Sequence, residues 1–263
     1  MSEERVLCQT LTEEERRTGI PSTEKQELTI DLVRMNGYVI FERALSPDLL
    51  ASLRSAFLDV FHAHVATVDP NRGANRYQMH LPFRAPFHDP AVITNTFALP
   101  IVDALLGKDA VCHYFASDTP LPGSDYQAVH SDIALLYPEA PFSLPAYSLV
   151  VNIPLVDFTE ENGPLEVWPG GTHLMPGGTD VQKLAPYLHS ERVKMPAGSV
   201  LIRDMRMWHR GTPNRSTEIR PNLALIYSRP WLKTHYPPIP IARDIQSTLS
   251  DRAKHLFRNE KVV

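Results

Sequence analysis

A histidine and an aspartate stand two residues apart near the middle of the chain, in the triplet His130-Ser131-Asp132. The surrounding run, residues 126–136, is rich in apolar residues and predicts a β-strand. Because side chains alternate between the faces of a strand, His130 and Asp132 are expected to point to the same side. Together with a second histidine they would occupy one face of a metal ion and leave the opposite positions open. That arrangement suits non-haem Fe(II) and oxygen chemistry.

The triplet by itself is a weak signal for a metal site. In a chain with 11 histidines, about 0.6 His-x-Asp triplets are expected by chance. The ordinary alternative is a strand histidine that hydrogen-bonds a nearby carboxylate. A metal site therefore needs a third ligand from another part of the chain.

His209 is the candidate for that third ligand. It lies just beyond the apolar run 199–204, where a predicted strand gives way to a turn. Strand ends at the mouth of a small β-barrel are common positions for ligand-binding side chains. The alternative is that His209 packs beside Trp208 and hydrogen-bonds a carbonyl group.

Arg220 lies eleven residues after His209, at the start of the apolar run 221–228. If these two strands are neighbours, the turn between them brings Arg220 back beside His209. A guanidinium binds a carboxylate through two N–H groups, at about 1.5–3 kcal/mol for each charge-assisted hydrogen bond. Arg215 competes with Arg220 as the anchor, but its Asn-Arg-Ser turn predicts exposure to solvent.

Composition narrows the class of protein. The chain has 263 residues, of which 43% are hydrophobic and 21% charged, and this balance is typical of a globular domain. Its formal net charge of −4 gives no basic excess, so no nucleic acid or membrane partner is expected. Cys8 and Cys112 are far apart and lack metal-binding spacing, which favours a reducing compartment. The N-terminus has no signal-peptide pattern, and we expect a cytoplasmic protein.

The pattern along the chain predicts a mainly β domain with flanking helices. Residues 1–27 are polar and predict an N-terminal arm, whereas 28–263 predict a single domain with a helical N-terminal part and a short C-terminal helix. Ser46 as N-cap, with Pro47 and Asp48 after it, marks the clearest helix start. Strands are predicted at residues 110–115, 127–137, 147–155, 165–168, 192–195, 199–204 and 221–228.

Several short motifs occur in a fixed order around the candidate ligands. Gln127 lies three residues before His130, and the later segments are Asn-Gly-Pro-Leu-Glu-Val-Trp-Pro-Gly-Gly-Thr-His at 162–173, Gly-Ser-Val-Leu-Ile at 198–202 and His-Arg-Gly at 209–211. With Arg220, these segments resemble the phytanoyl-CoA dioxygenase (PhyH) family of Fe(II)- and 2-oxoglutarate-dependent oxygenases. The resemblance runs from residue 36 to about residue 231. An ordered set of matches is far more specific than any one of them.

The resemblance implies a double-stranded β-helix, that is, a cupin-like jelly roll with iron at its mouth. It implies that His130, Asp132 and His209 are the catalytic iron ligands and that Arg220 holds the distal carboxylate of 2-oxoglutarate. Gln127 and Gln78 are implied as further contacts of this co-substrate. His173, which closes the Pro-Gly-Gly-Thr-His turn, is expected to be structural.

The implied chemistry is a dioxygenase reaction. Two histidines and one carboxylate leave three coordination positions, for 2-oxoglutarate and O2. The expected reaction is hydroxylation, desaturation or ring closure at an unactivated C–H bond, with release of succinate and CO2. Asp132 occupies the position that a halogenating relative would need vacant for halide.

The expected substrate is a small organic molecule resembling a natural product, as in secondary metabolism, and a homodimer is possible. Eight residues are hypothesised from residue type and loop position to line its pocket: Arg76, Tyr77, Met79, Phe83, Tyr137, Met207, Tyr227 and Trp231. The alternative function is a non-oxidative metal-binding jelly-roll protein, either an isomerase or a small-molecule-binding module. Arg220 discriminates between the two functions, because a dicarboxylate co-substrate explains its position.

Overall fold

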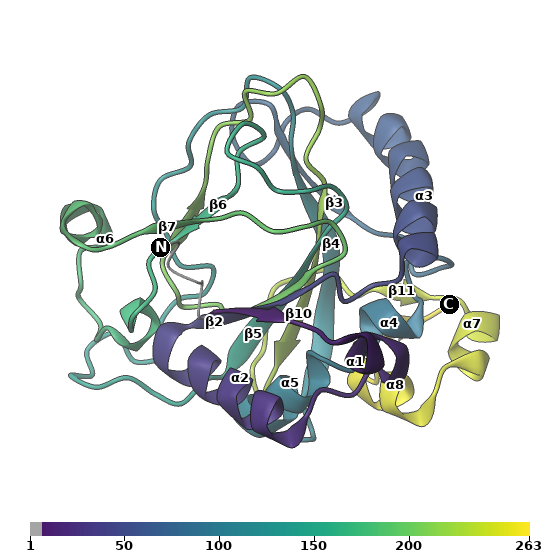
Figure 1. The fold of residues 1–263 in the computed structure, drawn as a ribbon, viewed down its shortest axis with the longest axis horizontal. Coiled ribbons are helices and arrows are strands. Elements are labelled where there is room, and N and C mark those ends of the chain that lie inside the picture. Colours follow the sequence, from purple (N-terminus) through teal and green to yellow (C-terminus); the bar gives the residue numbers. More distant parts are fainter. Residues whose placement is uncertain (1–6) are drawn as a thin grey trace.

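Two β-sheets that face each other form the centre of the molecule, and helices pack on the outer side of the larger sheet (Figure 1). The computed structural model describes residues 7–263, so the first six residues of the predicted N-terminal arm lie outside the described part. In spatial order, the larger sheet consists of β1 (Cys8–Thr10), β2 (Tyr38–Glu42), β8 (Val200–Asp204), β5 (Ser148–Pro154), β10 (Asn222–Ser228), β4 (Val111–Pro120) and β3 (Arg76–His80). The smaller sheet consists of β7 (Glu191–Val193), β6 (Leu165–Val167) and β9 (His209–Gly211).

The remaining elements lie around these sheets. The helices are α1 (Glu13–Thr18), α2 (Thr23–Asn36), α3 (Pro47–Val65), α4 (Pro90–Ile93), α5 (Leu99–Leu106), α6 (Val181–Leu184), α7 (Arg243–Thr248) and α8 (Asp251–Leu256), with short 3-10 turns at Thr172–Leu174 and Ala185–Tyr187. β11 (Pro240–Ile241) and β12 (Lys261–Val262) form a separate parallel pair. The predicted jelly roll with flanking helices is confirmed. Among the described residues, no helix combines the length and apolar character that crossing a bilayer requires.

Strand β10 shows how the sequence pattern divides the interior. It lies between β5 and β4 and pairs antiparallel with both. Leu223, Leu225 and Tyr227 pack in the large core with the helices, whereas Ala224 and Ile226 face the space between the sheets. This alternation follows from the two-residue period of a strand. The larger sheet therefore has an apolar outer face and an inner face that is available for a site.

Helix α3 begins as the sequence predicts. The side chain of Ser46 accepts a hydrogen bond from the backbone N–H of Leu49, and Pro47 occupies the first turn. Leu53, Phe57 and Phe61 are buried in the core. In Figure 1, α3 lies along one side of the larger sheet while α2 and α5 lie below it. The helices therefore cover the outer face and leave the space between the sheets free of helix.

The predicted strand at 127–137 is wrong. His130 forms a single isolated bridge with His209, after which the chain bends. The segment opposite, residues 204–209, turns away at this point, since the N–H of Met207 donates back to the carbonyl of Asp204 (3.1 Å). The backbone N–H of Asp132 consequently donates to Met205 O (2.9 Å), and no ladder continues.

The structure also adds elements that the sequence pattern did not predict. β3 forms in the segment around Gln78, which mixes polar and aromatic residues, because it pairs with β4. β1 joins the larger sheet through parallel pairing of Cys8 with Ile40. The C-terminal helical segment is divided into α7 and α8 by Leu249 and Ser250. The division of the chain at residue 27 stays a prediction.

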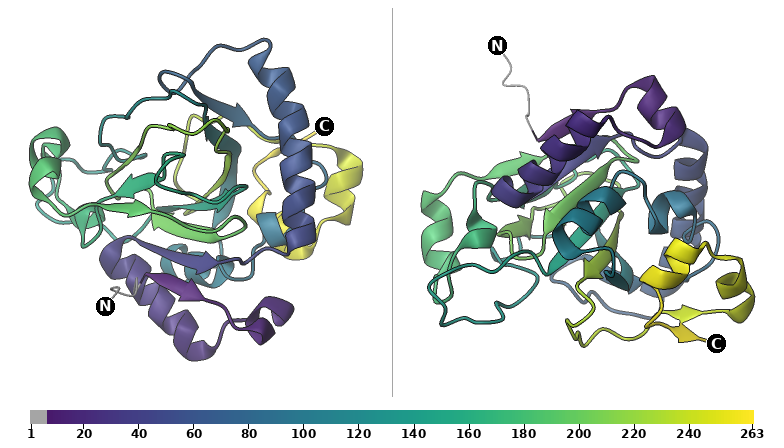
Figure 2. Two further views of the ribbon diagram at one scale, coloured as in Figure 1. Left: turned by 45° about the horizontal axis from the view of Figure 1, so that its top comes forward. Right: turned by 90° about the horizontal axis from the view of Figure 1, so that it is seen from below.

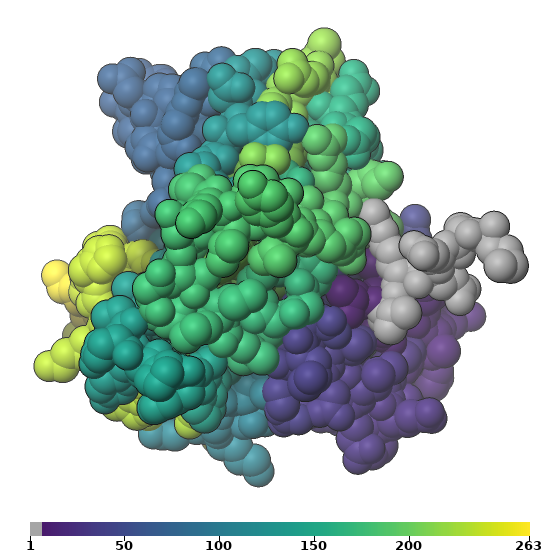
Figure 3. All heavy atoms as spheres, turned by 90° about the vertical axis from the view of Figure 1, so that its left-hand side faces the viewer, coloured from purple at the N-terminus to yellow at the C-terminus, as the bar shows by residue number. Residues whose placement is uncertain are grey.

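The two sheets form opposite walls of the space between them. The left view of Figure 2 shows the smaller sheet facing the strands of the larger one across the molecule. Figure 3 shows the long green connection between β6 and β7, which includes α6, covering the middle of the face away from α8. The inner strand residues are therefore shielded by both sheets and by this connection.

Candidate metal centre and co-substrate pocket

His130 and His209 are brought together by their own backbones. Each donates its N–H to the carbonyl oxygen of the other, and both N–O distances are 2.9 Å. The two imidazole centroids lie 4.4 Å apart. The single bridge between a loop and the start of β9 therefore fixes both rings on one side of the small sheet.

Asp132 completes a cluster of three candidate metal ligands. Its Oδ1 lies 3.6 Å from His130 Nε2, and its Oδ2 lies 3.4 Å from His209 Nε2. One ligand atom from each of the three residues lies within 4.8 Å of the others. Two imidazoles and a carboxylate in this arrangement are the donor set of non-haem Fe(II) sites with open positions.

Both rings are oriented so that Nε2 is free to bind a metal. His130 Nδ1 lies 2.8 Å from the carbonyl oxygen of Ala128, and His209 Nδ1 lies 3.0 Å from that of Met207. A carbonyl oxygen only accepts, so the proton belongs on Nδ1 and the lone pair on Nε2 faces Asp132. Hydrogen bonds of this kind orient histidine ligands in metal proteins. The three residues thus fit a divalent metal ion.

Burial and a neighbouring arginine determine the charge states of the cluster. Burial by itself raises the pKa of Asp132, yet the charge of Arg203 holds this pKa well below its usual range. Burial lowers the pKa of His209, and Arg203 lowers it further. At neutral pH the cluster therefore holds an ionised carboxylate and a neutral His209, and these are the protonation states that bind a metal.

Arg220 lies in a second buried cluster. Its Nη2 is 3.6 Å from Asp118 Oδ2, and its guanidinium lies over the ring of Phe158, 4.2 Å from the centroid. Arg76 Nη1 donates to the same Asp118 oxygen (3.1 Å), and Arg76 Nη2 donates to Thr212 O (3.2 Å). Burial lowers the pKa of Arg220 to about 9; Asp118 opposes this shift and Arg76 adds to it. The two arginines and one carboxylate carry one net positive charge.

Gly211 leaves the space that this arginine cluster needs. A Cβ atom at Gly211 would lie 2.6 Å from Cζ of Arg76, which is closer than real contacts allow. Its backbone N–H donates to Oε1 of Gln127 (2.9 Å), and its carbonyl accepts from the N–H of Gln127 (3.0 Å). Gln127 Nε2 donates to Arg72 O (3.4 Å). Gln127 thus connects the end of β9 to the loop that carries Arg72.

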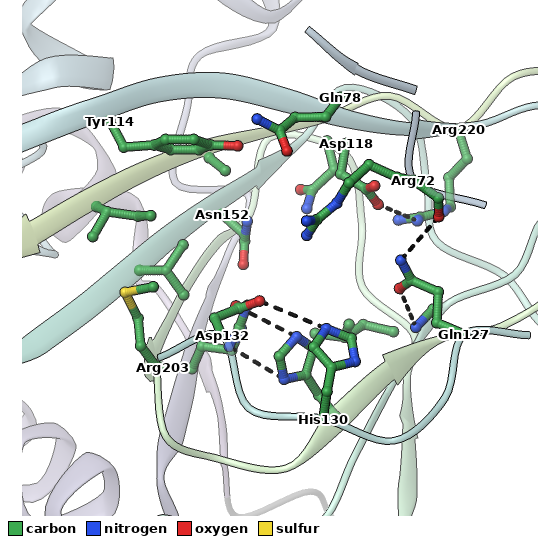
Figure 4. A pocket seen from close by; sticks show the side chains of 18 of the residues that line it. Arg72, Gln78, Tyr114, Asp118, Gln127, His130, Asp132, Asn152, Arg203 and Arg220 are labelled. Atoms are coloured by element: carbon green, nitrogen blue, oxygen red, sulfur yellow. Dashed lines mark hydrogen bonds and ion pairs between the residues drawn. The ribbon is translucent and has the colours of Figure 1, made fainter. Parts of the chain in front are cut away.

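One cavity joins the two clusters. It encloses about 100 Å³ and lies beside a hollow of about 310 Å³, and Arg72, Gln127 and His130 line both. The larger value lies at the lower end of the range for small-molecule pockets, about 300–1,000 Å³. Figure 4 shows Asp132 and His130 on one side of the cavity and Arg220 on the other.

The predicted site residues occupy different parts of this cavity. The structure brings His130, Asp132 and His209 together, and Arg220, Gln127 and Gln78 line the same cavity. Arg215 is exposed, and His173 is buried with its Nε2 3.0 Å from the carbonyl of Arg34. The exposure of Arg215 and the backbone contact of His173 agree with the sequence analysis.

The structure separates the eight residues that were hypothesised to line the substrate pocket. Arg76 lines the neighbouring hollow, and the other seven line neither that hollow nor the cavity between the two clusters. Tyr77, Met79 and Tyr227 pack in the core on the helix side of the larger sheet, and Trp231 is exposed. The apolar residues that do line the cavity are Val150, Leu165, Met205, Ala224 and Ile226.

Sequence reasoning missed several polar residues of the cavity. Asn152 interrupts the apolar run of β5, and Arg203 interrupts that of β8. Asp118 near the end of β4 contacts both arginines of the second cluster. A polar side chain at an inward position of an otherwise apolar strand was the available signal, because such a position is costly unless the group has a partner.

The fold and the site together define the class of protein: a double-stranded β-helix with a candidate mononuclear metal centre at its mouth. The profile of the phytanoyl-CoA dioxygenase (PhyH) family matches residues 33–222, and the chain belongs to this family. A relative described as dioxygenase af480, from Aspergillus fumigatus (strain ATCC MYA-4609 / CBS 101355 / FGSC A1100 / Af293), is 30% identical over 197 residues. That match covers 72% of this chain and 60% of the relative.

Solved structures share the fold at low sequence identity. AviO1 from Streptomyces viridochromogenes Tue57 has a TM-score of 0.62 and 19% identity, over 81% of this chain and 99% of that one. The epimerase SnoN in complex with Fe3+, alpha ketoglutarate and nogalamycin RO has a TM-score of 0.61 and 18% identity, over 79% of this chain and 85% of that one. These similarities support the architecture of two facing sheets.

Proposed function

We propose that the protein is an Fe(II)- and 2-oxoglutarate-dependent dioxygenase that oxidises an unactivated C–H bond of a small organic substrate. Its family and its dioxygenase relative support the class of reaction. The SnoN complex, which holds Fe3+ and alpha ketoglutarate, supports the pair of cofactors. The observation that carries the proposal is a single cavity with a His-Asp-His cluster on one side and a buried arginine on the other.

His130, Asp132 and His209 would hold the iron through two Nε2 atoms and one carboxylate oxygen. Iron held there supplies C–H oxidation by O2 coupled to decarboxylation of 2-oxoglutarate, which yields succinate and CO2. The carbonyl groups of Ala128 and Met207 keep both Nε2 atoms directed at the metal position. The chain thus presents a preoriented ligand set.

Arg220 would bind the distal carboxylate of 2-oxoglutarate. The cluster of Arg76, Asp118 and Arg220 carries one net positive charge, and one carboxylate neutralises it. Nε of Arg220 is buried and has no hydrogen-bond partner among the described residues, so the guanidinium has donor capacity left. A non-oxidative metal-binding jelly roll would leave this buried cation without a function, and we do not favour that alternative.

The inner face of the larger sheet would position the substrate. Met205, Ala224 and Ile226 offer an apolar wall beside the metal ligands, and the phenol groups of Tyr114 and Tyr236 add polar contacts. Burial raises the pKa of Tyr114, so its hydroxyl stays a neutral hydrogen-bond donor. This wall fits hydroxylation, desaturation or ring closure of a small natural-product-like molecule.

The apolar wall that includes Ala224 leads to a prediction for any compound that raises succinate release by the wild-type enzyme. Ala224→Phe is expected to lower kcat/KM for that compound at least about tenfold, because the added ring fills the cavity beside the metal ligands. The complex with iron and 2-oxoglutarate should remain, as judged by its visible absorption. Ala224→Ser serves as the matched small change. An unchanged kcat/KM in the Phe variant would show that substrate binds elsewhere.

The proposed function itself is tested by titrating anaerobic, metal-free protein with Fe(II) and then with 2-oxoglutarate. The expected result is a visible charge-transfer band that appears only when both are present, because the keto acid must chelate ferrous iron. Succinate in place of 2-oxoglutarate should give no band, since it lacks the keto group. Absence of the band in folded wild-type protein would contradict the proposal.

A further inference from the structure

Arg203 places a positive charge inside the jelly roll, next to the candidate metal ligands. It lies on β8, where Val200 and Ile202 pack toward the helices and Leu201 packs between the sheets. The side chain of Arg203 is 6% exposed and lines the cavity. Burying a guanidinium at an inward strand position is unfavourable unless another group compensates its charge.

The charge of Arg203 is directed at Asp132. Its Nη2 contacts Oδ2 of Asp132, and among the described residues this is the one carboxylate that forms an ion pair with it. Its Nη1 lies 3.5 Å from Nδ1 of His209, a nitrogen that already faces the carbonyl of Met207. Nε of Arg203 is buried and has no hydrogen-bond partner in the described part of the chain. The guanidinium therefore has no ionic partner there besides a candidate metal ligand.

We propose that Arg203 is a positioning residue that binds one oxygen of Asp132 and leaves the other for iron. This inference rests on the proposed function. A carboxylate held by a guanidinium on one oxygen offers a single donor atom to the metal, which keeps positions open for 2-oxoglutarate and O2. The positive charge of Arg203 also withdraws electron density from the Asp132 carboxylate. This withdrawal stabilises the ferrous state over the ferric state.

The neighbouring Arg210 provides a matched control. It follows His209 directly in β9, but its Nε donates to Oε2 of Glu166 (2.6 Å). Its guanidinium lies 4.4 Å from the ring centroid of Tyr126, and Arg210 does not line the cavity. A loss of positive charge at Arg210 therefore leaves Asp132 unchanged.

The test compares Arg203→Met, Arg203→Lys and Arg210→Met in the full chain under anaerobic conditions. With Fe(II) and 2-oxoglutarate bound, the charge-transfer band of Arg203→Met is expected at longer wavelength than in the wild type, and its Fe(III)/Fe(II) potential is expected to be lower. Both changes follow from greater electron density at iron. Arg203→Lys keeps the charge, so its band wavelength and potential should lie nearer those of the wild type. Arg210→Met should have the wild-type wavelength and potential.

The outcomes separate this inference from the proposed function. No band in the folded wild-type protein would overturn the function. A wild-type band that keeps its wavelength and potential in Arg203→Met would overturn the role of Arg203 alone. Circular dichroism of each variant verifies folding first. If Arg203→Met does not fold, Arg203→Gln removes the same charge with a polar side chain. Its band wavelength and its Fe(III)/Fe(II) potential then test the role of Arg203.

Discussion

Replacing His209 with alanine is expected to abolish the charge-transfer band of the complex with Fe(II) and 2-oxoglutarate and to lower Fe(II) affinity more than about 100-fold. His209 supplies one of three candidate ligands, and its Nε2 lies 3.4 Å from Asp132 Oδ2. With one imidazole left, the carboxylate remains engaged by Arg203, so the site cannot recover three donors. Anaerobic Fe(II) titration followed by visible spectroscopy measures both effects.

Two further variants distinguish ligand loss from misfolding. His62→Ala removes an exposed histidine from α3 and should leave Fe(II) affinity at the wild-type value. Asp132→Ala should also lower Fe(II) affinity, while both variants keep their wild-type circular dichroism. If His209→Ala folds and still gives the band at wild-type Fe(II) concentrations, His209 is not a ligand.

The clustering of His130, Asp132 and His209 and the β architecture could be predicted because their signals are local or periodic. The triplet at His130, the segment around His209 and the spacing to Arg220 are short patterns in one order along the chain. Several strands of the larger sheet are short, nearly continuous apolar runs that are buried on both faces. For β5, β8 and β10, the predicted strands overlap those of the structure.

The strand predicted at 127–137 shows where local patterns fail. Its apolar residues favour a strand, but a strand also needs a neighbouring strand with which its backbone can form hydrogen bonds. The segment opposite turns at Met207, so only the single bridge between His130 and His209 forms. His130 and Asp132 still converge, because the bend after His130 lets Asp132 bond to Met205 O. The predicted convergence was confirmed although the predicted element was wrong.

The lining of the cavity could not be predicted because it depends on which face of each strand turns inward. Tyr77 and Met79 were chosen for their residue type, yet they face the core, and Gln78 between them faces the cavity. A shift of one residue exchanges the two faces. The contacts of Asp118 and Arg203 join residues far apart in the sequence, so no local pattern contains them.

Replacing Arg220 with alanine is expected to weaken 2-oxoglutarate binding by about 100-fold or more, since two charge-assisted hydrogen bonds of about 1.5–3 kcal/mol each are lost. Arg76 remains on Asp118 Oδ2 and neutralises that carboxylate, so the cluster loses its one net positive charge. Arg220→Lys keeps the charge but not the planar fork, and we expect an intermediate loss. Titration of the Fe(II)-loaded variants with 2-oxoglutarate measures the affinities.

The specificity of this effect is tested with a keto acid that lacks the distal carboxylate. Pyruvate can chelate iron but cannot reach Arg220 with a second carboxylate, so its affinity should be weak in the wild type and nearly unchanged in Arg220→Ala. Arg215→Ala, at an exposed arginine five residues earlier, should leave both affinities unchanged. Equal weakening of pyruvate and 2-oxoglutarate in Arg220→Ala would mean that Arg220 only supports the cavity wall. Selective weakening of 2-oxoglutarate would identify the buried guanidinium as the group that recognises a dicarboxylate.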